Sequence, residues 1–275
     1  MSDLNKQKMK VYYAEANYGS SEIDAAIKVL KDSRLELMAG KNVKKLEKKV
    51  AKLFKKKFGL MTNSGSSANL LAIKSLSLKE GSKVITPALT FSTTVAPIVQ
   101  SNLVPLFIDV ERDTLQIDTK ILKSINLDNV SAICVPNLIG NIANWDELQE
   151  FSKENQLMLI EDSADTIGYE YSSNLSNWAD VTTTSFYASH VVTGAGFGGM
   201  VTFNDKKYFE TAQSLRGWGR RSSKYGETED YNRRFDCKID GFDYDDKYVF
   251  DDLGYNFLPS EISAAFALMQ LNNLK

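Results

Sequence analysis

The sequence predicts an α/β fold with a mostly parallel central sheet. Short apolar runs alternate with segments long enough for a helix, which is the rhythm of βαβ units. The runs that predict strands are 83–87, 104–110, 130–136 and 157–162. Apolar residues at helical spacing predict helices over 21–30, 43–58, 70–76 and 260–274. Such sheets bind ligands at the carboxyl ends of their strands, so the residues after each run are the candidates for a site.

Three segments carry further signals of local structure. The helix predicted over 21–30 opens with Ser21 and Asp24 at the spacing of a capping box. The helix over 43–58 sets an apolar stripe against a face of lysines, a pattern that a membrane-surface helix shares but that a solvated face explains. Residues 217–252 are rich in Arg, Asp, Tyr and Gly and lack aliphatic periodicity, which predicts a long insertion or lid.

Composition narrows the class of partner. The formal net charge of the 275-residue chain is -2, which provides no electrostatic reason to bind nucleic acid or an acidic membrane and favours small polar metabolites. The two cysteines, Cys134 and Cys237, have neither the number nor the spacing of a zinc site or a disulfide framework. No apolar stretch approaches the ~18 residues of a membrane span, and the first ten residues lack the apolar core of a signal peptide, so we expect a cytoplasmic protein.

The segment 63–69 has the sequence NSGSSAN and lies between an apolar run and a predicted helix. Its amides and hydroxyls would then lie at a helix N-terminus, where unpaired N–H groups and the helix dipole favour an anion such as phosphate. A capped turn that binds no ligand fits the spacing at least as well.

The predicted strand over 157–162 leads into the sequence IEDSAD, which holds three carboxylates. Glu161 and Asp162 are adjacent, so they point to opposite faces of the sheet and only one can enter a given pocket. No second cluster of ligands accompanies them, which argues against a metal site. An aspartate at the end of a strand more often orients a ligand or caps a helix.

The chain has one histidine, His190, between a polar β-rich run over 181–187 and a glycine cluster. Gly194, Gly196 and Gly199 match the dinucleotide fingerprint G-x-G-x-x-G, which requires a helix directly after it. Residues 198–205 predict a strand followed by a turn instead. We therefore reject a dinucleotide site and expect the glycines to form a flexible turn near a ligand. A single histidine more often has a structural role than a catalytic one, so its role has to be inferred from the residues on either side of it.

Five motifs in chain order, NSGSSAN, TPALTFSTT, IEDSAD, SFYASH and LGYNFLPSEISAAFALMQL, resemble those of the DegT/DnrJ/StrS-type sugar aminotransferases. These are fold type I enzymes that use pyridoxal 5'-phosphate (PLP). The resemblance implies a three-layer αβα fold, with an N-terminal segment over 1–35, a PLP-binding large domain over 36–255, and over 256–275 the start of an interdomain helix. The family continues into a small C-terminal domain, which is expected to be absent from this sequence.

The resemblance also implies roles for individual residues. The positions that match phosphate ligands of the cofactor are Ser64, Gly65, Ser66, Ser67 and Ser185. Phe91 matches an aromatic ring that stacks on the pyridine, and Asp162 matches the aspartate that keeps the pyridine nitrogen protonated. Asp165 stands where many relatives have a glutamine near the cofactor's hydroxyl. Asn256 matches an asparagine that reaches the phosphate from the neighbouring subunit, which implies a homodimer with shared active sites.

His190 departs from the family pattern. Most members have at this position the lysine that holds the cofactor as a Schiff base, and histidine cannot form that link. Its proton affinity suits a general base near neutral pH. The nucleotide-sugar 3-dehydratases, which deoxygenate carbon 3 of a 4-keto-6-deoxy sugar with pyridoxamine 5'-phosphate (PMP), resemble this sequence there. The resemblance thus implies a 3-dehydratase of deoxysugar or lipopolysaccharide biosynthesis, with His190 as the base and a nucleotide-linked 4-keto-6-deoxyhexose as substrate.

The predicted insertion over 217–252 also resembles that of the 3-dehydratases. Iron–sulfur members carry cysteines in it, whereas this chain has Ser222, Ser223 and Lys224 there and Cys237 as the insertion's one cysteine, which implies the cluster-free kind. The glycine turn has Phe197 where the family usually has glutamate, and it is one residue longer.

Two alternatives remain open. The chain could be an aminotransferase relative that lost its lysine and binds cofactor or sugar without turnover, alone or with an active partner. It could also be a partial gene product that folds as a large domain with little activity.

Overall fold

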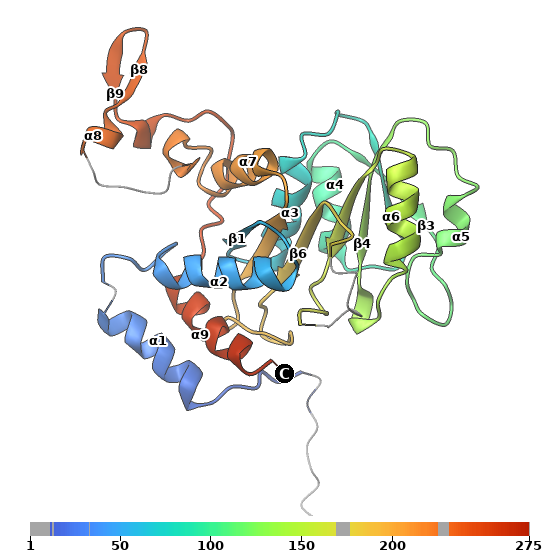
Figure 1. Ribbon diagram of the computed structural model, residues 1–275, viewed down its shortest axis with the longest axis horizontal. Coiled ribbons are helices and arrows are strands. Elements are labelled where there is room, and N and C mark those ends of the chain that lie inside the picture. The colour runs from blue at the N-terminus through green and yellow to red at the C-terminus, as the bar shows by residue number, and fades with distance from the viewer. Residues whose placement is uncertain (1–11, 13, 33, 169–176, 225–230, 275) are drawn as a thin grey trace, which may run out of the picture.

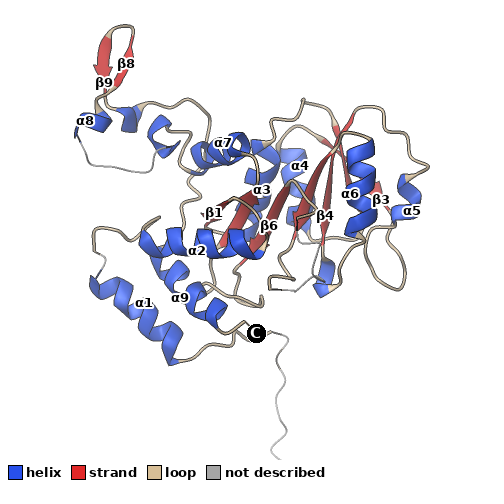
Figure 2. Ribbon diagram, in the orientation of Figure 1, coloured by secondary structure: helices blue, strands red, loops and turns tan. Residues whose placement is uncertain are grey.

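The computed structural model describes residues 12, 14–32, 34–168, 177–224 and 231–274. Within them a seven-stranded sheet lies between two layers of helices (Figure 1 and Figure 2). The strands are β1 (Phe58–Thr62), β2 (Lys83–Pro87), β3 (Val104–Ile108), β4 (Val130–Pro136), β5 (Met158–Asp162), β6 (Val181–Ser185) and β7 (Gly199–Phe203). Their order is β1-β7-β6-β5-β4-β2-β3, and β7 runs in the opposite direction to the other six strands. The predicted mostly parallel sheet is confirmed.

Helices cover both faces of this sheet. The helices α3 (Gly65–Ser75), α4 (Ser92–Gln100) and α7 (Lys206–Arg216) pack on one face. The helices α2 (Lys41–Leu53), α6 (Trp145–Glu154) and α9 (Glu261–Asn272) pack on the other, with α5 (Thr119–Leu122) beside α6 and α1 (Ser20–Asp32) against α9 (Figure 1). The predicted three-layer αβα arrangement is therefore confirmed. The domain boundaries suggested at 35/36 and 255/256 stay a prediction.

The alternation of side chains along β4 shows why a continuous apolar run is needed in the middle of such a sheet. Ala132 and Cys134 pack toward the layer of α3, α4 and α7. Ile133 and Val135, between and after them, pack toward α6. All four are buried, because both faces of the strand are covered.

Two predicted helix ends were wrong. α2 ends at Leu53, not at Phe58, because Lys55 adopts a left-handed backbone (φ 50°) and the N–H of Lys56 returns to the carbonyl of Ala51 at 2.8 Å. α3 begins at Gly65, five residues before the predicted start at Leu70, so the polar segment belongs to its first turn.

The predicted capping box of the first helix was also wrong. α1 begins at Ser20, which places Ser21 inside the helix. The carboxylate of Glu22 accepts instead from the N–H of Gly19 at 2.9 Å and from the Ser21 hydroxyl at 2.8 Å. The acidic residue that binds the free N–H groups of this turn is therefore Glu22 and not Asp24.

The segment 217–252 leaves the body of the molecule after α7 and returns to α9. Its described parts form short elements: η2 (Arg221–Lys224), α8 (Tyr231–Arg234), β8 (Cys237–Ile239), β9 (Phe242–Tyr244) and η3 (Asp246–Tyr248). Figure 1 shows the β8–β9 hairpin far from β3, at the opposite end of the molecule. That this segment is an insertion or a lid stays a prediction. In the described part of the chain no helix has both the length and the apolar character needed to cross a membrane.

Candidate active site

The polar segments singled out in the sequence meet at the carboxyl edge of the sheet. β1, β5 and β6 all end at this edge, in Thr62, Asp162 and Ser185 respectively. The strand between β1 and β6 is β7, which runs the opposite way and therefore begins here with Gly199. Residues from four distant parts of the sequence are brought together in this way.

Ser64 caps the N-terminus of α3. Its Oγ accepts from the N–H of Ser67 at 3.1 Å and lies 3.0 Å from the Ser67 Oγ. Ser66 is exposed, and no described residue accepts from its N–H, which is a free donor of this first turn. Free amides, hydroxyls and the helix dipole make this turn suited to a small anion such as a phosphate group.

Two glycines shape the turn. A Cβ on Gly65 would lie 2.6 Å from the Cβ and 2.9 Å from the Oγ of Ser185, so the two residues touch. A Cβ on Gly199 would lie 2.4 Å from the carbonyl carbon of Ser64. A side chain at position 65 would occupy the space beside the Ser185 hydroxyl, and one at position 199 would collide with the backbone of Ser64 and Gly65. The predicted phosphate residues are thus adjacent, and the cradle they form requires these glycines.

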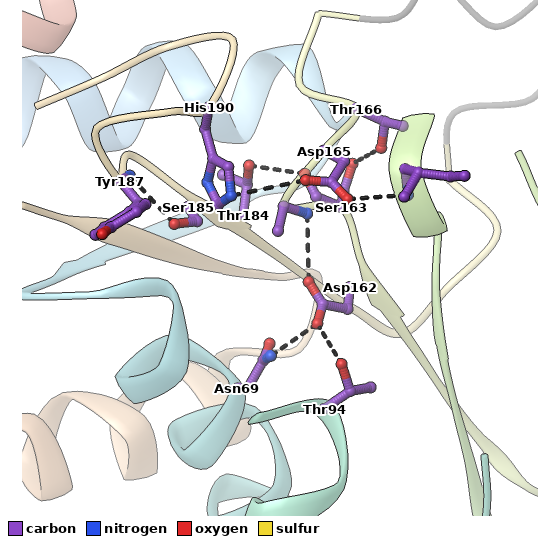
Figure 3. Close-up of polar contacts among 12 residues, drawn as sticks. Asn69, Thr94, Asp162, Ser163, Asp165, Thr166, Thr184, Ser185, Tyr187 and His190 are labelled. Carbon is purple, nitrogen blue, oxygen red and sulfur yellow. Dashed lines mark hydrogen bonds and ion pairs between the residues drawn. The ribbon is translucent and has the colours of Figure 1, made fainter. Parts of the chain in front are cut away.

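Asp162 is held from two sides at the end of β5. Its Oδ2 accepts from Asn69 Nδ2 at 2.8 Å and from Thr94 Oγ1 at 2.9 Å, and its Oδ1 accepts from the N–H of Ala164 at 3.3 Å (Figure 3). Asn69 is oriented in turn by the Thr183 hydroxyl, which donates to its Oδ1 at 2.5 Å. The carboxylate is therefore fixed in position by neutral donors.

Burial raises the pKa of the Asp162 carboxyl, and the hydrogen bonds from Asn69 and Thr94 lower it only in part. Asp162 forms no ion pair with any residue that the structure describes. A protonated ring nitrogen placed against it would offset the cost of burying its charge. The carboxylate thus fits the role that the sequence predicts for it.

Glu161 and Asp162 point to opposite faces, as predicted from their adjacency. Glu161 accepts from Asn137 Nδ2 at 2.9 Å and from Thr182 Oγ1 at 3.0 Å, on the far side of β5 from Asn69. In the described chain no three His, Cys, Asp or Glu side chains gather into a group that could hold a metal ion.

His190 and Asp165 face each other. The distance from His190 Nε2 to Asp165 Oδ1 is 3.6 Å, within ion-pair range and just beyond a hydrogen bond (Figure 3). The backbone N–H of His190 donates to the carbonyl of Tyr187 at 3.1 Å, and the Tyr187 ring meets the imidazole edge-on. Tyr187 is tied by its own N–H to Ser185 Oγ at 3.2 Å, so the histidine loop joins the phosphate cradle.

The glycine turn leads straight into a strand. Gly196 and Gly198 have positive φ angles of 92° and 121°, and β7 starts at Gly199 with no helix between. The rejection of a dinucleotide fingerprint is confirmed. Phe197, between the two glycines, is exposed.

Phe91 and Asn256 lie outside this network. Phe91 is the N-cap of α4 and its ring is 66% exposed. Asn256 is exposed and pairs through its backbone with Gly217. No described contact joins either side chain to Asp162 or to the cradle.

Sequence reasoning missed Asn69, Thr94 and Thr183, which orient Asp162. Asn69 lies four residues after Gly65, on the part of α3 that is buried against the sheet. Because residues four apart lie on the same face of a helix, the spacing of Asn69 from Gly65 could have indicated that Asn69 lies near the site.

The sequence matches a known family. Residues 17–275 match the DegT/DnrJ/EryC1/StrS aminotransferase family. The chain belongs to that family. Members similar to it include the dTDP-4-dehydro-2,6-dideoxy-D-glucose 3-dehydratase of Saccharopolyspora spinosa, 37% identical over 252 residues that cover 87% of this chain and 54% of the relative. The GDP-4-keto-6-deoxy-D-mannose 3-dehydratase of Escherichia coli O55:H7 is 33% identical over 259 residues, covering 90% of this chain and 64% of the relative.

A solved structure of the family shares the fold. GDP-4-keto-6-deoxymannose-3-dehydratase with a trapped PLP-glutamate geminal diamine superposes with a TM-score of 0.83 at 29% identity. The match covers 96% of this chain and 68% of that chain. Since this member of the DegT/DnrJ/EryC1/StrS family spans only 54% and 64% of the two curated relatives, the activity of the whole protein is a matter for proposal.

Proposed function

We propose that this chain carries the cofactor site of a PLP/PMP-dependent 3-dehydratase that acts on a nucleotide-linked 4-keto-6-deoxyhexose in deoxysugar or lipopolysaccharide biosynthesis. The observation that carries the proposal is the position of His190. It stands at the carboxyl edge of the sheet, on the loop tied to Ser185 and facing Asp165, where the family resemblance places a lysine. The names of two similar relatives, both 3-dehydratases of nucleotide-linked deoxysugars, support the same activity.

Each part of the cofactor has a matching set of residues in this proposal. The phosphate binds at the cradle made by Ser64, Gly65, Ser66, Ser67 and Ser185. Asp162 pairs with the ring nitrogen and holds its proton, Phe91 stacks on the ring, and Asp165 lies near the ring hydroxyl. Asn256 reaches the phosphate of a second copy of the chain, so we propose a cytoplasmic homodimer with shared sites.

His190 supplies the proton transfer. When bound, the cofactor provides an amine that reacts with the sugar's keto group and a ring that accepts electrons. The His190 imidazole would accept a proton from the carbon that bears this amine, and the 3-hydroxyl would leave with a proton as water. A histidine suits this step because its neutral form accepts a proton near pH 7 and cannot hold the cofactor covalently.

The insertion is consistent with a cluster-free enzyme. Cys237 accepts a hydrogen bond from Arg221 Nη1 at 3.0 Å, and the chain's other cysteine, Cys134, is buried in β4. Two cysteines cannot provide the four thiolates of a two-iron two-sulfur cluster.

A second candidate function is binding of the cofactor or of a nucleotide sugar without turnover, alone or beside an active partner. The named activities are those of relatives of which this chain spans 54% and 64%.

Incubation with PMP and a GDP-, CDP- or dTDP-linked 4-keto-6-deoxyhexose separates the two candidates. Mass spectrometry of the sugar nucleotide is expected to show loss of one oxygen atom with the wild-type chain, with PMP converted to PLP and ammonia, and the rate should be at least about 100-fold lower with His190→Ala. Turnover that survives His190→Ala undiminished would contradict the assignment of the base. Binding of PMP without deoxygenation of the sugar, with and without a full-length relative present, would favour the second candidate.

A further inference from the structure

The two carboxylate oxygens of Asp165 serve two different neighbours. Oδ2 accepts from the backbone N–H of Ile139 at 3.0 Å, and Oδ1 faces His190 Nε2 at 3.6 Å. Figure 3 shows the Asp165 carboxylate and the imidazole directed toward each other. Asp165 therefore links the turn after β4 to the histidine loop after β6.

Ile139 has an unusual backbone at this link. Its φ and ψ are 52° and 29°, in the left-handed region, where a β-branched residue is a genuine outlier. The side chain is 66% exposed, so burial of the isoleucine does not explain the conformation. In this conformation the N–H of Ile139 points toward Asp165 Oδ2 and donates to it. Strain of this kind persists where surrounding structure requires it, often at functional sites.

The two ring nitrogens of His190 lie in different surroundings. Nε2 faces a carboxylate oxygen. An ionised carboxylate accepts hydrogen bonds but cannot donate one. Nδ1 is buried and has no hydrogen-bond partner among the residues that the structure describes. A neutral imidazole carries one proton, and the nitrogen beside the acceptor is the one favoured to carry it.

We propose that Asp165 is a positioning residue that fixes the orientation of the His190 ring and holds it in the Nε2–H tautomer, so that Nδ1 carries the lone pair. The catalytic part of this proposal rests on the proposed function above, in which His190 is the base. The tautomer itself is a property of the chain.

Because the chain has one histidine, its tautomer can be measured without assignment. Protein labelled with ¹⁵N-histidine gives one pair of imidazole nitrogens in a long-range ¹H–¹⁵N correlation spectrum above the pH at which the ring becomes neutral. The expected result is a protonated Nε2 and an unprotonated Nδ1. A predominantly Nδ1–H ring in the unmodified protein would overturn the proposal without any variant.

Asp165→Asn gives a sharper test, because it should invert the tautomer. An amide has one acceptor oxygen, and the Ile139 N–H requires it. The amide nitrogen then faces His190 Nε2, which must become an acceptor, so the ring shifts to Nδ1–H. Asp128→Asn is the matched control, since Asp128 is exposed and bonded only to Asn126 among the described residues. An Nε2–H tautomer of His190 in folded Asp165→Asn would contradict the proposal. A change of the His190 tautomer in Asp128→Asn would also contradict it.

The kinetic result separates this inference from the proposed function. With saturating PMP and the sugar nucleotide, Asp165→Asn is expected to lower kcat about 100-fold or more. An Nε2–H ring in a wild-type chain that performs no dehydration would support the positioning role and contradict the proposed activity. Dehydration at an unchanged kcat in Asp165→Asn would contradict the positioning role and leave the activity supported.

Discussion

Gly65 and Ser185 touch at the carboxyl edge of the sheet, with the Ser185 side chain occupying the place where a Cβ of residue 65 would stand. They come from the first turn of α3 and from the end of β6, 120 positions apart in the sequence numbering. The contact matters because it sets the distance between the α3 amides and the Ser185 hydroxyl, the two kinds of donor proposed to bind one phosphate.

Gly65→Ala is therefore expected to weaken binding of PMP about tenfold or more, which corresponds to about 1.4 kcal/mol. The added methyl group would have to displace Ser185 from a distance of 2.6 Å. Titration of the cofactor's fluorescence measures the affinity. Gly19→Ala is the matched control, because a Cβ there meets nothing closer than 3.8 Å and lies outside the site. Equal affinity in Gly65→Ala and Gly19→Ala would show that the cradle does not bind the phosphate.

Asp162→Asn is expected to separate cofactor affinity from stability. Without the carboxylate, PMP should bind about 10- to 100-fold more weakly, as expected for loss of a charge-assisted hydrogen bond of about 1.5–3 kcal/mol.

Without cofactor, the Asp162 carboxylate should instead lower the free energy of unfolding as pH rises. Burial raises the pKa of Asp162 above 3.8 in the folded state, so the folded state binds a proton more tightly than the unfolded state. Ionisation then reduces the free energy of unfolding as pH increases above 3.8, and this pH-dependent loss is absent in the variant. Urea unfolding between about pH 4 and pH 8 measures the difference between wild type and Asp162→Asn. A difference that shifts toward the wild type with increasing pH would contradict a raised pKa for the buried carboxyl.

His190→Lys tests the alignment of the histidine with the family's lysine. A primary amine at this position should hold PLP covalently, because the side chain can condense with the cofactor's aldehyde whereas imidazole cannot. Borohydride reduction followed by peptide mass mapping is expected to find the modification at residue 190 in the variant. Wild-type protein treated in the same way is the control. Labelling confined to other lysines would place residue 190 too far from the cofactor.

Glu22 is predicted to stabilise the packing of α1 on α9 in a pH-dependent manner. The N–H of Gly19 lowers the pKa of this carboxyl to about 2, helped by Ser21 and by Gln270 of α9, whose Nε2 donates at 2.9 Å. A folded-state pKa below the unfolded value of 4.5 means that the stabilisation is present above pH 4.5 and disappears as pH falls toward 2.

Glu22→Gln should therefore lower the free energy of unfolding by about 1–2 kcal/mol at about pH 7 and by much less at about pH 3. Urea unfolding at the two pH values provides the test. Glu15→Gln is a suitable control, because Glu15 is exposed and shows no contact among the described residues. A loss of the same size at both pH values would contradict the role of the ionised carboxylate.

Local pattern predicted much of the architecture. The runs 83–87 and 130–136 coincide with β2 and β4, because a strand covered on both faces is predominantly apolar. The ends of helices were predicted less well. α2 stops at a left-handed Lys55, and Glu22 rather than Asp24 binds the first turn of α1, since several polar residues there could serve as caps and packing selects among them.

The candidate site was predictable in its residues but not in its connections. IEDSAD and NSGSSAN pointed to Asp162 and Ser64 through their position after apolar runs. Nothing local indicated that Asn69 and Thr94 hold Asp162, because hydrogen bonds between residues 93 and 68 positions apart depend on how the strands are ordered in the sheet.

By itself the sequence determined the α/β class, the cofactor motifs and the presence of a histidine where a lysine is usual, because each of these depends on residue type and short-range spacing. The tertiary structure decided which groups meet. The turn containing Ile139 and the loop containing His190 follow different strands, and only the parallel order of β4, β5 and β6 brings both to Asp165. Which nitrogen of the lone imidazole faces an acceptor is therefore a property of the sheet's topology, which no local pattern encodes.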